Sequence, residues 1–196
     1  MVYALYLIDE NKKYIFDNWL ECSNNIKGKK ARYKKFKNEM EAKKWLDEGA
    51  NYETYTKLDS DAIYFDAGTG RGIGVEVRVT NHLGASILNE IMPKEKINEF
   101  GNYLLAPNRT NNFGELCGLF IALKYAKKYK VKKIYGDSEL VIKYWSKRIY
   151  NEKNLEKDTI KLIIQVSDMY SEFIQNGGEL KKISGDINPS DLGFHK

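Results

Sequence analysis

Hydrophobic and polar positions alternate in short blocks along the first fifty residues, and the blocks predict a small α+β unit. Short runs of apolar and aromatic residues between polar turns indicate strands, whereas longer runs behind Asp or Asn and closed by Gly indicate capped helices. The predicted strands are residues 3–7, 14–16 and 31–36, and the predicted helices are residues 19–26 and 39–49.

The pattern changes after a polar stretch that has no clear period. Three strand-like segments follow one another, and helical and strand-like segments then alternate, which favours a mixed sheet. The strand-like segments are residues 62–66, 73–79, 85–92, 131–137 and 179–184, and the helical segments are residues 115–129, 138–148 and 158–176. We therefore expect two domains, residues 1–50 and 62–196, joined by a linker at residues 51–61.

Composition narrows the class of protein. Hydrophobic residues make up 42% of the chain and charged residues 30%, which is the balance of a soluble globular protein. Cys22 and Cys117 are far apart and form no CxxC pair, so we expect neither a disulfide framework nor a zinc site. The N-terminal apolar stretch spans only about seven residues and no run approaches the ~18–20 residues of a membrane span, so we expect a cytoplasmic protein without a membrane partner.

Four acidic residues occupy positions that suit a sheet-based metal site. Asp66 and Asp137 close predicted strands, Glu115 opens a predicted helix, and Asp191 follows the last strand. Each alone is an ordinary strand-end or helix-end residue, but carboxylates gathered at one sheet edge repel one another unless cations neutralise them. Mg²⁺ or Mn²⁺, which prefer oxygen ligands, would be the matching ions.

The sequences around these acids form a recognisable series. YFDAGTG, TNNFGEL, YGDSELV and NPSDLG resemble, in the same order, the four acidic motifs of the type 1 ribonuclease H family over residues 62–194. The resemblance implies an α/β ribonuclease H fold, with a five-stranded mixed sheet flanked by helices. It also implies hydrolysis of the RNA strand of RNA–DNA hybrids with two Mg²⁺ ions, giving 5′-phosphate and 3′-hydroxyl ends. Asp66 would bridge both ions, and Glu115, Asp137 and Asp191 would complete their coordination.

The same resemblance assigns roles to residues around the acids. Asn111 and Asn112 match positions that touch the minor groove of the hybrid, and Arg109 could replace a family arginine whose place Asn108 takes. A histidine that the family often carries in the loop before the last aspartate is missing. We therefore expect His195, four residues after Asp191, to take its role as a proton donor or shuttle.

The first domain is basic. Residues 27–37 carry seven Lys or Arg and no acid, and the net charge of the chain is +5, which suits phosphate binding without requiring it. YAL near the start, WLEC, Gly28 and ARYKKF resemble the small hybrid-binding domain at the N-terminus of many type 1 ribonucleases H. The resemblance implies that aromatic residues contact the DNA strand and basic residues its backbone. These residues are Tyr3, Trp19 and Tyr33, and Arg32, Lys34 and Lys35.

Two other functions remain open at this point. The chain could be a related two-metal nuclease acting on DNA or double-stranded RNA, or a non-catalytic hybrid-binding protein. Asn111, Asn112 and the basic domain favour hybrids over the first alternative. The presence of all four acids weighs against the second.

Overall fold

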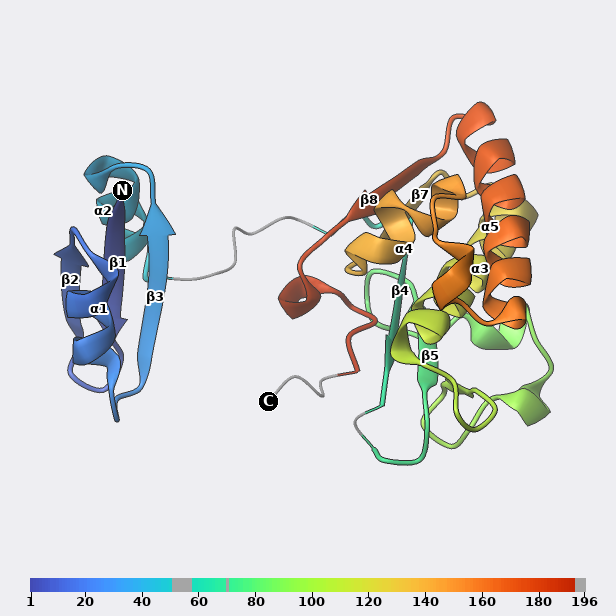
Figure 1. Ribbon diagram of the computed structural model, residues 1–196, viewed down its shortest axis with the longest axis horizontal. Helices are drawn as coiled ribbons and strands as arrows, with labels where there is room; N and C mark the ends of the chain where they lie inside the picture. Colours follow the sequence, from blue (N-terminus) through green and yellow to red (C-terminus); the bar gives the residue numbers. More distant parts are fainter. Residues whose placement is uncertain (51–57, 70, 193–196) are drawn as a thin grey trace. The chain divides into compact units, whose positions relative to one another are not determined.

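The computed structural model describes residues 1–50, 58–69 and 71–192 and divides the chain into two compact units, Met1–Thr56 and Lys57–Lys196 (Figure 1). Most of the predicted linker, at residues 51–57, lies outside the described residues.

The first unit is a three-stranded antiparallel sheet with strand order β2-β1-β3. Both helices begin after an asparagine cap: the side chains of Asn18 and Asn38 each accept a hydrogen bond of 2.9 Å from the N–H three residues later. The predicted small α+β domain is confirmed. Its elements are β1 (Val2–Leu7), β2 (Lys12–Phe16), α1 (Trp19–Ile26), β3 (Ala31–Phe36) and α2 (Glu39–Asp47).

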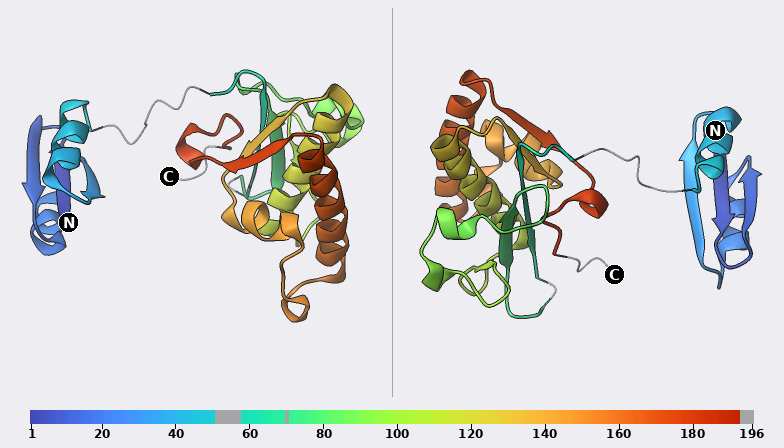
Figure 2. Two further views of the ribbon diagram at one scale, coloured as in Figure 1. Left: turned by 90° about the horizontal axis from the view of Figure 1, so that it is seen from above. Right: turned by 180° about the vertical axis from the view of Figure 1, so that it is seen from behind.

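Alternation along β1 gives this unit two small cores, one on each face of the sheet. Leu5 and Leu7 are buried with Cys22 of α1, whereas Ala4 is buried with Trp45 of α2. The sheet therefore lies between α1 and α2, as Figures 1 and 2 show. The face of each β3 residue follows from this alternation.

The second unit contains a five-stranded mixed sheet with strand order β6-β5-β4-β7-β8. β4, β5 and β6 pair antiparallel, whereas β4, β7 and β8 pair parallel. This arrangement confirms the mixed sheet that the sequence predicted. The strands are β4 (Ala62–Gly68), β5 (Glu76–Thr80), β6 (Tyr103–Leu104), β7 (Lys133–Gly136) and β8 (Glu179–Lys182), and the helices are α3 (Asn111–Tyr129), α4 (Glu139–Lys143) and α5 (Lys157–Gln175).

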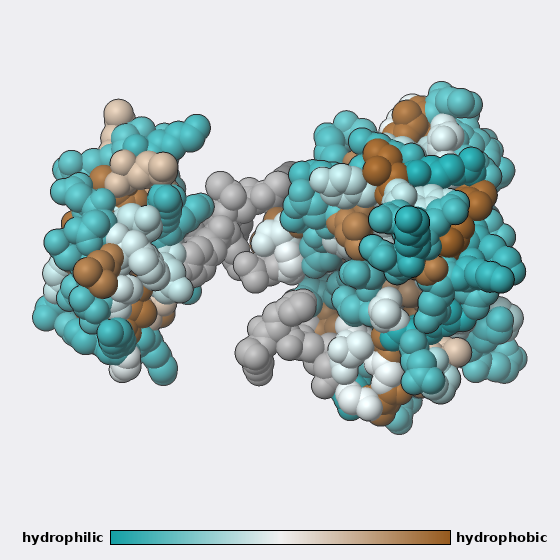
Figure 3. All heavy atoms as spheres, viewed as in Figure 1, coloured by the Kyte–Doolittle hydropathy of each residue, from teal (hydrophilic) through white to brown (hydrophobic). Residues whose placement is uncertain are grey.

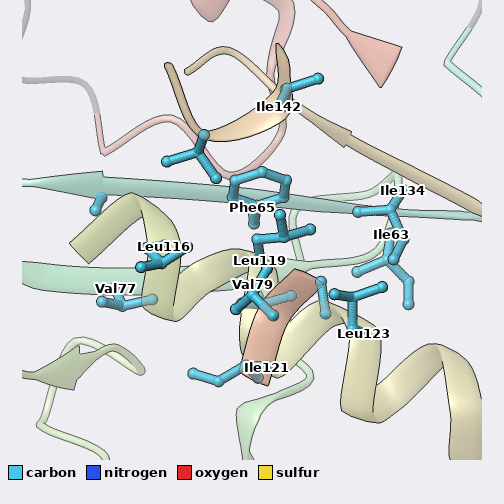
Figure 4. Close-up of a cluster of buried hydrophobic side chains, with 14 of the residues drawn as sticks. Ile63, Phe65, Val77, Val79, Leu116, Leu119, Ile121, Leu123, Ile134 and Ile142 are labelled. Atoms are coloured by element: carbon cyan, nitrogen blue, oxygen red, sulfur yellow. The ribbon is translucent and has the colours of Figure 1, made fainter. Parts of the chain in front are cut away.

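Helix α3 packs closely on the central strand β4. Phe65, Leu116 and Leu119 are fully buried between them (Figure 4). A Cβ on Gly114 would lie 2.4 Å from Cγ1 of Val75, so only a glycine lets the helix approach the sheet this closely at that turn. The close approach brings the first turns of α3 to the level where β4 ends.

The prediction of a strand at residues 85–92 is wrong. A short 3₁₀ helix, Leu88–Glu90, occupies this segment, and the third strand of the antiparallel meander is β6, only two residues long. The apolar residues Ile87, Leu88, Ile91 and Met92 recur at helical rather than alternating spacing, which fits a helical turn and not a strand.

The start of α3 also differs from the prediction. It begins at Asn111, where the Thr110 hydroxyl accepts a 3.2 Å hydrogen bond from the N–H of Phe113. Glu115 therefore lies one turn inside the helix rather than at its opening.

None of the helices in the described part of the chain is long and apolar enough to cross a membrane. Figure 3 shows hydrophilic residues over most of the visible surface of both units.

Candidate active site

Three carboxylates meet at one edge of the mixed sheet. Asp66 lies in β4, Glu115 in α3, and Asp137 directly follows β7; each offers an oxygen, and these oxygens lie within 4.8 Å of one another. The parallel pairing of β4 with β7 ends at Tyr64 opposite Tyr135. Both aspartates stand two residues beyond this last pair, so equivalent positions on adjacent parallel strands place their side chains together.

Beyond the last residue pair of β4 and β7, side chains form hydrogen bonds with the backbone groups of β4. The N–H of Ala67 donates a 3.1 Å hydrogen bond to Oε1 of Glu115, and the C=O of Phe65 accepts a 3.0 Å hydrogen bond from the amide of Asn188. Backbone groups buried here need such partners. The bond from Ala67 fixes the carboxylate of Glu115 beside Asp66.

Two of the three carboxylates are buried and the third, Asp137, is half-buried, so their charges are costly without a counterion. Asp66 is 2% exposed and Glu115 4% exposed. Burial, reinforced by the charge of Asp137, raises the pKa of Asp66 to about 6, and burial with the charges of both aspartates raises the pKa of Glu115 well above its usual value. Oε2 of Glu115 is buried and has no hydrogen-bond partner in the described structure. An all-oxygen donor set of this kind fits a hard divalent cation.

The carboxylates line an open cleft of about 430 Å³. Asn111 and Asn112, predicted as substrate contacts, line the same cleft. The remaining lining residues were not predicted from the sequence. Lys182 could have been found, because it follows Leu180 by two residues in β8 and so points to the same side of the strand. These residues are Ala67, Ser138, Lys182, Ile183, Ser184 and Gly185.

Gly185 lies against the carboxylate of Asp137. A Cβ at this position would be 3.0 Å from Oδ2 of Asp137. A larger residue would push on this carboxylate, so the glycine after Ser184 keeps the wall of the cleft close to the acids.

Asp191 is not one of the residues whose oxygens meet within 4.8 Å. Its neighbour Leu192 donates a 3.2 Å backbone hydrogen bond to Oδ2 of Asp66, so the chain passes directly beside the cluster. The role of Asp191 stays a prediction.

Residues 188–192, which we call the C-terminal strap, are held on β4 and β5. The Ser190 hydroxyl donates to the C=O of Tyr64 at 2.7 Å and lies 2.8 Å from the hydroxyl of Thr80. Ser190 and Thr80 are fully buried. Of this segment, the sequence predicted only the role of Asp191 and not these contacts.

Arg109 does not line the carboxylate cleft. Its guanidinium pairs with Glu156 at 3.1 Å and Asp158 at 2.7 Å, in a separate groove of about 550 Å³. Its role as a substrate contact stays a prediction. His195 lies outside the described residues.

The aromatic residues predicted in the first unit form one exposed cluster. The ring of Trp19 lies 5.5 Å from that of Tyr3 and 5.3 Å from that of Tyr33, measured between centroids. Trp19 is 44% and Tyr33 42% exposed. The ammonium group of Lys35 lies 5.6 Å from the ring centroid of Tyr3. An exposed aromatic surface with an adjacent cation suits nucleic acid.

The predicted basic contacts divide between the two faces of this sheet. Tyr33 and Lys35 pair opposite Leu5 and Tyr3, on the α1 face, so Arg32 and Lys34 point to the α2 face. Arg32 donates to the C=O of Gly49 at 3.5 Å, and the ammonium group of Lys34 lies 5.6 Å from the ring centroid of Phe36. Lys35 alone of the three shares the surface of the aromatic cluster.

Part of the first unit matches a known protein family. Residues 11–46 match the family described as the ribonuclease H1 N-terminal domain. This match confirms the predicted likeness of the first unit to the N-terminal domain of type 1 ribonucleases H. A search of curated proteins found no match.

Solved structures give further likenesses. The chain is similar to ribonuclease H1 of the halophilic archaeon Halobacterium salinarum, with 18% identity over 66% of this chain and 89% of that chain and a TM-score of 0.41. It is similar to the N-terminal ribonuclease H domain of a Mycobacterium tuberculosis protein, with 20% identity over 66% and 92% and a TM-score of 0.37. A ribonuclease H1 isolated from compost by a metagenomic approach gives 22% identity over 62% and 81% and a TM-score of 0.35.

Proposed function

We propose that this chain, which carries a ribonuclease H1 N-terminal domain, is a divalent-metal-dependent endonuclease that hydrolyses the RNA strand of RNA–DNA hybrids and leaves 5′-phosphate and 3′-hydroxyl ends. The observation that carries the proposal is the cluster of buried Asp66 and Glu115 with half-buried Asp137, in a cleft that Asn111 and Asn112 also line. Residues 1–50 would then bind the hybrid and residues 62–196 would cut it.

Two Mg²⁺ ions, or Mn²⁺ in their place, are the cofactors in this proposal. Asp66 would hold both ions, with Glu115, Asp137 and Asp191 as their further ligands. Bound in this way, the ions would activate a water molecule for attack on the phosphate and stabilise the leaving 3′ oxygen.

The chain itself holds the ligand oxygens in place. Ala67 donates to Oε1 of Glu115 and Leu192 donates to Oδ2 of Asp66, so each buried carboxylate has one oxygen fixed by the backbone. Partners of this kind, behind the ligands, orient metal-binding side chains. The fixed oxygens keep the site ready before substrate arrives.

Asn111 and Asn112 supply the selectivity for a hybrid. They form the first positions of α3 and line the cleft one turn before Glu115. Their amides can donate and accept hydrogen bonds, which is what base edges and a 2′-hydroxyl in a wide minor groove offer. Selectivity for the RNA strand follows from reading that hydroxyl next to the acids.

A cleavage assay tests the proposal. Labelled RNA–DNA, RNA–RNA and DNA–DNA duplexes are incubated with the full chain in Mg²⁺, Mn²⁺ or EDTA, and the product ends are identified by their response to phosphatase and to 3′-end ligation. We expect cleavage of the RNA strand of the hybrid in either metal and none in EDTA.

The same assay separates the alternatives. Cutting of RNA–RNA or DNA–DNA at an equal rate would identify a nuclease of other substrates. Binding of the hybrid without cutting in any metal would identify a non-catalytic hybrid-binding protein.

A further inference from the structure

We propose that Lys182, held by Glu139, is a phosphate-binding residue of the cleft that contacts the backbone of the hybrid beside the carboxylates. The inference rests on the proposed function and adds to it a substrate contact that sequence reasoning did not assign.

The position of Lys182 follows from the register of the sheet. It is the last residue of β8 and pairs with Gly136, the residue before Asp137. Leu180, two residues earlier, packs against the core, so Lys182 continues on the same side beyond the end of that core. The side chain consequently reaches the cleft of the acids.

Glu139 fixes the ammonium group. Its carboxylate accepts hydrogen bonds from Lys182 at 3.2 Å and from Lys143 at 2.7 Å. Two lysines on one carboxylate leave one positive charge in excess at this corner. The side chain of Lys182 is 43% exposed, so a ligand can reach it.

The positive charge of Lys182 lies where it can attract the phosphate backbone of a nucleic acid. The acids repel a phosphodiester, and among the described residues that line the cleft Lys182 is the one with a cationic side chain. Ammonium groups bind backbone phosphates without reading sequence. A lysine preset by Glu139 loses less side-chain freedom on binding than a free one, so it positions the backbone at small entropic cost.

Lys181 provides a matched control. It is the neighbouring residue of the same strand, and by alternation it points to the opposite side. Its ammonium group pairs with Glu179 at 2.8 Å and it does not line the cleft. Lys181→Gln and Lys182→Gln therefore remove the same charge from the chain at two sites that differ in their access to the acids.

The test measures cleavage of a short hybrid under single-turnover conditions, with the enzyme in excess of the hybrid but below the concentration that saturates it, at about 0.1 M salt. Lys182→Gln should lower kcat/KM about tenfold, Lys181→Gln should leave it within about twofold of wild type, and Lys182→Arg should restore most of the loss. The salt dependence of kcat/KM should also become shallower by about one phosphate contact in Lys182→Gln alone.

A chemical counterpart identifies the phosphate. Hybrids that carry one neutral methylphosphonate at each successive position should include one or two positions that slow the wild type and Lys181→Gln but not Lys182→Gln. Equal responses of the two glutamine variants, or a methylphosphonate profile unchanged in Lys182→Gln, would overturn the phosphate contact while wild-type cleavage still supports the proposed function. Absence of hybrid cleavage by the wild type would overturn both.

Discussion

The backbone N–H of Leu192 donates a 3.2 Å hydrogen bond to Oδ2 of Asp66, a residue 126 positions earlier in the chain. The C-terminal strap thus returns to the first of the clustered carboxylates. Because this bond ties one oxygen of a buried carboxylate to the backbone, it holds the side chain of Asp66 in place beside Glu115 and Asp137. The last described segment of the chain is therefore part of the candidate site, although it belongs to no helix or strand.

Neutralising one carboxylate should abolish cleavage without abolishing binding. Asp66→Asn or Asp137→Asn keeps the shape of the side chain but removes a negative charge that the metal requires. We expect at least about a hundredfold loss of hybrid cleavage, on the scale of removing one group that stabilises charge in the transition state. Affinity for the hybrid, measured by fluorescence anisotropy in EDTA, should stay within about twofold of wild type because the first unit is intact. Turnover near that of wild type in either variant would refute the metal-site assignment.

The raised pKa values predict a pH dependence of stability in the metal-free protein. Burial, and then the charge of Asp137, raises the pKa of Asp66 to about 6. The folded state therefore keeps a proton that the unfolded state releases near pH 4. The stabilisation that this proton supplies is fully present below about pH 4 and is lost as the pH rises to about 6, on the order of 2–3 kcal/mol. Glu115 acts in the same direction.

Thermal unfolding in EDTA between pH 4 and pH 7.5 checks this dependence. Asp66→Asn should be more stable than the wild type at pH 7.5 and should lose that advantage at pH 4. Mg²⁺ should stabilise the wild type at pH 7.5 because it binds the ionised carboxylates. An Asp66→Asn advantage that does not change with pH would show that the cluster carries no such charge repulsion.

How far the sequence predicted the site depended on what each residue does. Asp66, Glu115 and Asp137 were predictable because strand ends and the first turns of a helix bring acids to one sheet edge, and the structure places their oxygens together. Asn188 and Ser190 were not predictable, since their partners are the backbone of Phe65 and Tyr64, more than 120 residues away. Hydrogen bonds of small polar side chains to distant backbone leave no periodic signal in a sequence.

The fold, like the site, contains elements that local sequence predicts and elements that depend on distant contacts. The helices and most strands follow from periodicity and capping, whereas β6 has two residues and owes its existence to pairing with β5. Strand pairing of so short a segment depends on tertiary context rather than on its own propensity.

The two faces of the first unit should differ in their contribution to hybrid binding. Trp19→Ala should weaken binding about tenfold, because it removes the central ring of the exposed aromatic cluster. Lys35→Glu, on the same face, should weaken binding more than Lys34→Glu, which places the same charge change on the face of α2. Anisotropy titrations of a hybrid at several salt concentrations measure all three. Equal losses for the two lysine variants would mean that binding depends on net charge and not on the aromatic face.

The last prediction concerns the fully buried hydroxyl of Ser190 in the C-terminal strap. Ser190→Ala leaves the hydroxyl of Thr80 and the C=O of Tyr64 without this partner, which should lower the free energy of unfolding by about 1–3 kcal/mol. Adding Thr80→Val removes one of the two groups that lost their partner. The double variant should therefore be at least as stable as the sum of the two single effects predicts. Urea unfolding measures both.

The Ser190 contact should also affect metal binding, and a control variant distinguishes this effect from the loss of stability. A loosened strap withdraws the Leu192 N–H from Asp66, so Ser190→Ala should need several-fold more Mg²⁺ for half-maximal cleavage and bind Mn²⁺ correspondingly more weakly in the absence of nucleic acid. Ser146→Ala is the control, because Ser146 is equally buried and donates a 2.8 Å hydrogen bond to the C=O of Ile142 in another part of the unit. It should lose comparable stability with no change in metal requirement. The same shift in metal requirement for both variants would assign the effect to general loosening of the fold and remove the strap from the positioning of Asp66.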